Sequence, residues 1–81
     1  MNDHNTDRLA DLTTAEQIAK RHYDNALELL ACCHRERAAD PCQGTLDMLI
    51  QARKRVDRAH AAWEQAQEDF AAAWEEEYGW P

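Results

Sequence analysis

The chain contains no serine, and only two glycines and two prolines occur among its 81 residues. β-Branched residues are also scarce, because three aliphatic ones and four threonines are all that the chain holds. Strands and tight turns depend on these residue types, so the composition excludes a β-sandwich, a barrel and an α/β nucleotide-binding fold. Apolar residues form 44% of the chain and charged residues 31%, a balance that favours a single folded domain over disorder.

The usual components of nucleophilic catalysis are missing as well. A chain without serine has no serine nucleophile elbow, and two glycines are too few for a phosphate-binding loop. No apolar run approaches the ~20 residues of a membrane span, and no leader segment is recognisable at the N-terminus. We therefore expect a cytoplasmic protein with no membrane partner, no cofactor and no enzymatic activity.

Charge is abundant but unevenly placed. Sixteen acids against nine bases give a formal net charge of −7, and residues 64–81 carry six acids and no base. Residues 41–63 are instead net positive because of a basic cluster, which consists of Arg53, Lys54, Arg55 and Arg58. Such a cluster can contact a phosphate backbone, although in an acidic chain it is more often a solvated helix face. Binding of RNA by a dimeric helical bundle is therefore kept as an alternative function.

The spacing of apolar residues predicts two helices. From Leu49 to Ala73, apolar residues recur at alternating intervals of three and four, with a large residue alternating with alanine. A looser form of the same repeat extends from Leu12 to Cys33. The predicted organisation is a single domain with an N-terminal arm at 1–12, helices at 14–38 and 45–78, a turn at 39–44 and a tail at 79–81.

Capping signals set the predicted helix boundaries. Thr13 and Thr14 each precede a glutamate or glutamine by three residues, which is the pattern of a capping box. Asp40 is followed by Pro41, and this pair predicts a second start with Asp40 as the N-cap and proline in the first turn.

The short connection makes the two helices antiparallel neighbours. In a hairpin centred near Pro41, the numbers of facing residues add up to about 82, which places Trp63 against Ala19 and Val56 against Ala26. Large residues then face small ones, as a tight seam requires. We expect an all-α antiparallel hairpin with a longer second helix. Because one seam leaves other apolar residues uncovered, we also expect two hairpins to pair as a homodimeric four-helix bundle.

Three cysteines and a histidine lie near the turn: Cys32, Cys33, His34 and Cys42. An odd number of cysteines does not make a disulfide framework, and reduced thiols are expected. Adjacent residues on a helix point about 100° apart, so Cys32 and Cys33 rarely reach one metal ion. We predict no metal site, and a thiol or metal sensor that uses these four residues is the second alternative function.

The C-terminal segment combines aromatic and acidic side chains. Its candidate partner-binding residues are Trp74, Glu75, Glu76, Glu77, Tyr78 and Trp80. Tryptophan and tyrosine are preferred anchors at protein interfaces, and acidic neighbours attract a basic partner surface. The leading prediction is a small acidic protein-binding module, an inhibitor or adaptor of a larger nucleic-acid-handling protein. An anti-defence protein encoded by a phage or mobile element is one such inhibitor.

Overall fold

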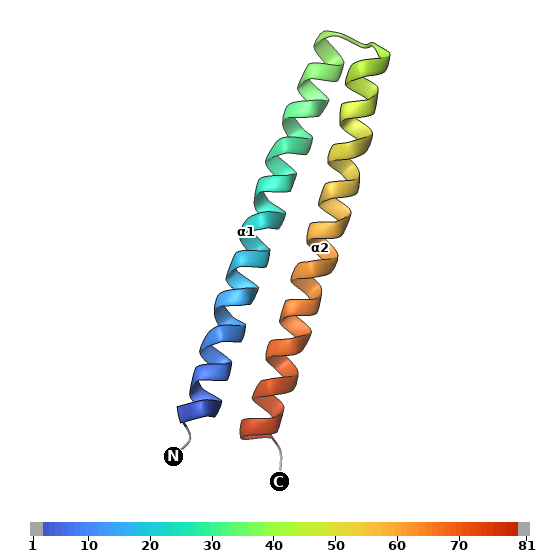
Figure 1. Ribbon diagram of the computed structural model, residues 1–81. Coiled ribbons are helices and arrows are strands. Elements are labelled where there is room, and N and C mark those ends of the chain that lie inside the picture. The colour runs from blue at the N-terminus through green and yellow to red at the C-terminus, as the bar shows by residue number, and fades with distance from the viewer. Residues whose placement is uncertain (1–2, 80–81) are drawn as a thin grey trace.

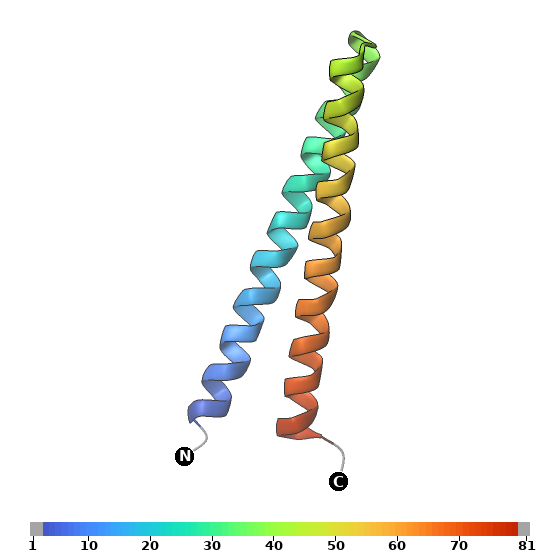
Figure 2. The ribbon, with the colours of Figure 1, turned by 45° about the vertical axis from the view of Figure 1, so that its right-hand side comes forward.

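The computed structural model describes residues 3–79, with side chains described from residue 7 onward, and this part of the chain is helical apart from the connection at 40–42 and the final Gly79. Helix α1 (Asp3–Ala39) and helix α2 (Gln43–Tyr78) lie side by side and antiparallel, as Figures 1 and 2 show. The resulting rod measures 60 × 20 × 13 Å. Both termini lie at one end of the rod, here called the open end, and the connection forms the turn end (Figure 1). The predicted all-α hairpin is confirmed.

The seam between the helices contains the residues that the repeat predicts. Five of the residues whose side chains are described are buried, and all occupy predicted seam positions: Ala26, Cys33, Ala52, Val56 and Ala73. The register is also as predicted, because Trp63 contacts Glu16, Lys20 and Tyr23, which surround Ala19 on α1. Small residues at these positions allow the two backbones to approach closely.

The predicted start of the first helix is wrong. Helix α1 begins at Asp3 rather than at residue 14, so residues 3–12 of the predicted arm belong to the helix, and residues 1–2 lie outside the described residues. Thr13 and Thr14 do not cap it; their hydroxyls donate to the carbonyls of Leu9 and Ala10 at 2.8 and 3.0 Å. A threonine inside a helix commonly bonds back in this way. With 37 residues in α1 and 36 in α2, the second helix is not the longer one.

The predicted N-cap of the second helix is also wrong. Asp40 still belongs to the end of α1, since its N–H donates to the Glu36 carbonyl at 2.9 Å. The N-cap is Cys42, whose N–H donates to the Thr45 hydroxyl at 3.1 Å within a capping box. The Arg37 guanidinium donates to the Cys42 carbonyl at 2.7 Å and ties the connection to α1. These contacts start α2 two residues earlier than the predicted residue 45.

The hairpin covers little of its apolar surface. Among the described residues no large side chain is fully buried, and seven large apolar side chains are exposed. Neither helix, over its described residues, has a stretch apolar enough to cross a bilayer. The uncovered apolar side chains are therefore the features of the surface that require an explanation.

Candidate protein-binding surface

An exposed row of aromatic rings runs along the last two turns of α2. This aromatic row consists of Phe70, Trp74 and Tyr78, which are spaced four residues apart and so share one helix face. The ring centroids of Phe70 and Trp74 are 6.1 Å apart, and those of Trp74 and Tyr78 are 4.5 Å apart. Trp74 is 51% exposed and Tyr78 59% exposed. The row therefore presents two large rings to solvent on a rigid helix.

The aromatic row lies in the most acidic part of the molecule. Residues 1–16 and 64–81, which meet at the open end, together hold ten acids and one base, a net charge of −9. Residues 17–63 hold six acids and eight bases, a net charge of +2. The single base of the open end, Arg8, pairs with Glu76 at 2.7 Å, and both side chains are more than half exposed. An ion pair this exposed contributes little to stability, but it fastens the first turns of α1 to α2.

The predicted partner-binding residues do not all belong to one surface. Glu75 and Glu76 are both exposed, but Glu76 pairs with Arg8 and lies about 160° around the helix from Trp74. Glu77 is half-buried. Trp80 lies outside the described residues. Trp74, Tyr78 and Glu75 are thus the predicted residues that lie on neighbouring positions of one side of α2, and Phe70, which was not among the predicted partner-binding residues, extends the row.

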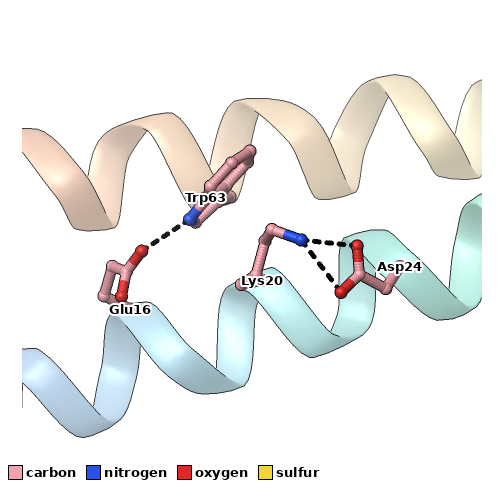
Figure 3. Close-up of polar contacts among 4 residues, drawn as sticks. All are labelled: Glu16, Lys20, Asp24 and Trp63. Carbon is pink, nitrogen blue, oxygen red and sulfur yellow. Dashed lines mark hydrogen bonds and ion pairs between the residues drawn. The ribbon is translucent and has the colours of Figure 1, made fainter.

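A polar and aromatic cluster around Trp63 joins the two helices in the middle of the hairpin (Figure 3). The indole N–H of Trp63 donates to Glu16 Oε1 at 2.7 Å, and its ring stacks on Tyr23 at 5.5 Å. Lys20 Nζ lies 5.2 Å from the centre of the Trp63 ring while it donates to both carboxylate oxygens of Asp24. This cluster was not predicted, although Glu16, Lys20 and Tyr23 follow helical spacing. It holds the segment from which the aromatic row extends.

The four predicted thiol or metal ligands remain apart. Cys33 is buried in the seam, Cys32 faces Glu36 with its sulfur 3.8 Å from Oε1, and His34 lies exposed beside a hollow on the surface. No three potential ligands lie together among the described residues. A sensor that gathers these residues around one ion in a single chain therefore has no geometric support.

Cys42 differs from the other two thiols because it caps a helix and is exposed. Hydrogen bonding from the Thr45 backbone N–H, and then from the Thr45 hydroxyl, lowers the pKa of the Cys42 thiol below its ordinary value, with a smaller contribution from the Arg37 guanidinium. Donors at a helix N-terminus favour the thiolate over the thiol, and the thiolate is the reactive form.

Alkylation of Cys42 is therefore expected to reach its full rate at a lower pH than alkylation of a short unstructured cysteine peptide. The lowered pKa means that the thiolate predominates from a lower pH upward. Peptide-resolved mass spectrometry after brief iodoacetamide treatment across a pH series measures the profile. Thr45→Val removes the hydroxyl but keeps the backbone N–H. The pH profile for alkylation of Cys42 in this variant should therefore lie between the profiles of wild-type Cys42 and the peptide. Coincident profiles for Cys42 and the peptide would contradict the assignment.

The predicted basic cluster is divided between surfaces. Arg55 and Arg58 line hollows on one side of the hairpin, while Arg53 and Lys54 line a different hollow with Leu30 and other residues. Arg53 is also within 3.5 Å of the Asp57 carboxylate. The four bases thus do not form the continuous stripe that a nucleic-acid backbone requires, and the geometry gives RNA binding no particular support.

No protein-family model, curated protein or solved structure matches this sequence.

Proposed function

We propose that the chain is a non-catalytic protein-binding module that docks its aromatic row, with the neighbouring Glu75, onto a basic surface of a larger partner. The observation that carries the proposal is the exposure of Trp74 and Tyr78 at the acidic open end. Each large ring buries ~150–250 Å² when it enters an interface, and tryptophan and tyrosine dominate measured binding hot spots. About half of each ring stays open to solvent, although Trp74 packs against both Phe70 and Tyr78.

The charge distribution indicates the kind of partner. A net charge of −9 at the open end raises the rate at which a positively charged surface meets the aromatic row and repels acidic competitors. Proteins that hold phosphate backbones present such positive surfaces. The module then acts stoichiometrically as an inhibitor or adaptor of a nucleic-acid-handling protein, and occupying the phosphate site is how an anti-defence protein of a phage or mobile element acts by charge mimicry.

We further propose that the acting species is a homodimer, a four-helix bundle of two hairpins. Between residues 7 and 79 the buried core of one chain consists of five residues, three of them alanines. Chains of this size gain only ~3–5 kcal/mol from their own core, and association is a common way to add to it. The accessible surface of 6179 Å² also exceeds the ~5,000 Å² expected for a compact monomer of 9.4 kDa.

The binding proposal is tested with Trp74→Ala combined with Tyr78→Ala. We expect the double variant to fold normally but to bind the partner roughly 30-fold more weakly, since two exposed anchors are lost. The partner is first captured from lysate with immobilised wild-type chain and then purified for titration. Affinity should also fall with added salt, and each bound chain should displace one equivalent of nucleic acid from the partner.

Ile50→Ala is the matched control. Ile50 is 43% exposed, close to the exposure of Trp74, but it lies near the turn end of α2 and away from the acidic segments. Its truncation is expected to leave partner affinity unchanged. If the double variant captured the same partner as tightly as the wild type and Ile50→Ala do, the aromatic row would not be the binding surface.

A further inference from the structure

A second surface of the hairpin is shaped for contact with another helical pair. Three adjoining hollows of about 390, 500 and 510 Å³ run along one side of the seam, and neighbouring hollows share lining residues. We call this side the groove face; it is lined in part by Ala15, Ile18 and Leu29 of α1 and by Met48, Ala59 and Ala62 of α2. None of its lining residues belongs to the aromatic row or is Trp63, so the two surfaces are separate.

The groove face combines apolar side chains that project with small residues between them. Ile18, Leu29 and Met48 are 45%, 39% and 48% exposed, although each is a residue type that is normally buried. Alanines between them leave recesses. A projecting residue beside a recess is the arrangement that interdigitates when helices pack against each other.

We propose that the groove face binds the groove face of a second copy in antiparallel orientation, so that the turn end of each chain lies beside the open end of the other. This inference rests on the proposed homodimer and adds its interface and its orientation. A two-fold axis in the interface, perpendicular to the rods, produces this arrangement. It pairs α1 with α1 of the copy and α2 with α2 of the copy.

Electrostatics favours the antiparallel orientation over the parallel one. In a parallel dimer two ends of net charge −9 would coincide, and like charges brought together in this way are destabilising. In the antiparallel dimer each acidic end lies beside a segment of net charge +2 in the other chain. Charge repulsion therefore favours the antiparallel dimer over the parallel one, even though either orientation can form apolar contacts.

The positions of two charged side chains on α2, Arg55 and Asp69, also favour the antiparallel orientation. Arg55 lines all three hollows, and positions 55, 62 and 69 are one heptad apart, so Asp69 follows Arg55 and Ala62 along the groove face. Asp69 is exposed and accepts a hydrogen bond from Gln65 Nε2 at 2.9 Å. A two-fold axis at Ala62 places Arg55 of each chain opposite Asp69 of the other. The residue on the axis is then an alanine, which allows the closest approach.

The available area is sufficient for such a dimer. The hollows begin at Asp47, fifteen residues before the proposed axis at Ala62, so a contact symmetric about this axis extends along the same side of α2 to residue 77, about 45 Å of helix at ~1.5 Å per residue. Over the 20 Å width of the rod, this corresponds to about 900 Å² per chain. About 1,800 Å² in total exceeds the size of ~1,000 Å² that separates specific interfaces from chance contacts. The aromatic rows remain outside, one at each end of the bundle.

Disulfide trapping tests the orientation. In a background of Cys32→Ala, Cys33→Ala and Cys42→Ser, the substitution Ala62→Cys introduces one thiol at the proposed axis. We expect rapid oxidation of the folded protein to a disulfide-linked dimer of twice 9.4 kDa. Ala61→Cys, one residue away and outside the groove lining, is the matched control and should remain monomeric under non-reducing electrophoresis.

A charge exchange provides an independent test of the same geometry. Sedimentation equilibrium should show Arg55→Asp and Asp69→Arg each weakening the dimer roughly tenfold at low salt, because two attractions become repulsions. The double variant should recover the wild-type dissociation constant, and circular dichroism confirms that all three variants remain helical. A dimer without the 62–62 disulfide and without recovery would overturn the antiparallel groove-face arrangement while leaving the homodimer in place. A wild-type chain that sediments as a monomer would overturn both, and partner binding by the aromatic row would still be measurable.

Discussion

Trp63→Ala is expected to lower the free energy of unfolding by about 2–3 kcal/mol, which is most of the stability that a chain of this size possesses. The indole is half-buried and joins the two helices through a hydrogen bond to Glu16 and stacking on Tyr23. A hydrogen bond to a charged acceptor contributes about 1.5–3 kcal/mol and an aromatic pair about 0.5–1.5 kcal/mol, before solvent exposure reduces both. Urea unfolding followed by circular dichroism at fixed protein concentration measures the change.

Trp74→Ala makes the same substitution on the same helix and serves as the matched control. The aromatic partners of Trp74 among the described residues are Phe70 and Tyr78, one turn away on either side, and such pairs contribute about 0.2–0.5 kcal/mol each. Its loss is expected to cost less than about 1 kcal/mol. Trp63→Phe keeps the stacking and removes only the donor, so it should fall between the two. Equal losses at positions 63 and 74 would show that Trp63 does not fasten the hairpin.

The seam could be predicted from the sequence because it depends on periodicity and on a short connection. Heptad spacing identifies which residues face the partner helix, and a turn near Pro41 then fixes their register, so Ala26 and Val56 are both buried as expected. Neither inference requires knowledge of side-chain conformations. The same holds for the aromatic row, since four-residue spacing alone places Trp74 and Tyr78 on one face.

The predicted start of the first helix and the predicted N-cap of the second were wrong because, at both places, a local sequence signal competes with tertiary packing. Thr13 begins a capping-box pattern, but its hydroxyl bonds to the Leu9 carbonyl once α2 offers the preceding turns a surface to pair with, as the contact of Arg8 with Glu76 shows. The connection is similar: Asp40 has the properties of an N-cap, yet Cys42 takes that place because its N–H reaches Thr45. Local patterns cannot rank two such alternatives.

The cluster around Trp63 and the groove face depend on the rotation of each helix about its own axis. A register that pairs Trp63 with Ala19 does not determine whether the ring lies toward Glu16 and Tyr23 or toward the opposite side of the seam. In the structure the ring lies toward Glu16 and Tyr23. The opposite side of the seam is lined by Ala15, Ile18 and Ala59. A rotation of the helix by tens of degrees about its axis decides on which side the ring lies, and a heptad pattern does not specify helix rotation that finely.

Ala26→Asp is expected to abolish the cooperative folding of the hairpin. Ala26 is 3% exposed at the centre of the seam, so the substitution introduces a carboxylate where solvent does not reach. An uncompensated buried charge costs about 3–5 kcal/mol, which equals the whole stability available from a core of this size. The variant should lose its sigmoidal urea transition and much of its helical signal at neutral pH.

Ala61→Asp separates burial from helix propensity. Ala61 is exposed in the interior of α2, so the same change carries the same propensity cost of up to about 0.7 kcal/mol without desolvation. Lowering the pH should reduce the difference in free energy of unfolding between Ala26→Asp and Ala61→Asp. Burial raises the pKa of a carboxyl, so the charge penalty at position 26 is absent below the unfolded-state pKa and grows as the pH rises toward the folded-state pKa. Equal stability of the two variants at neutral pH would mean that position 26 is not enclosed between the helices. The register that brings Trp63 to Glu16, and with it the groove face, would then be wrong.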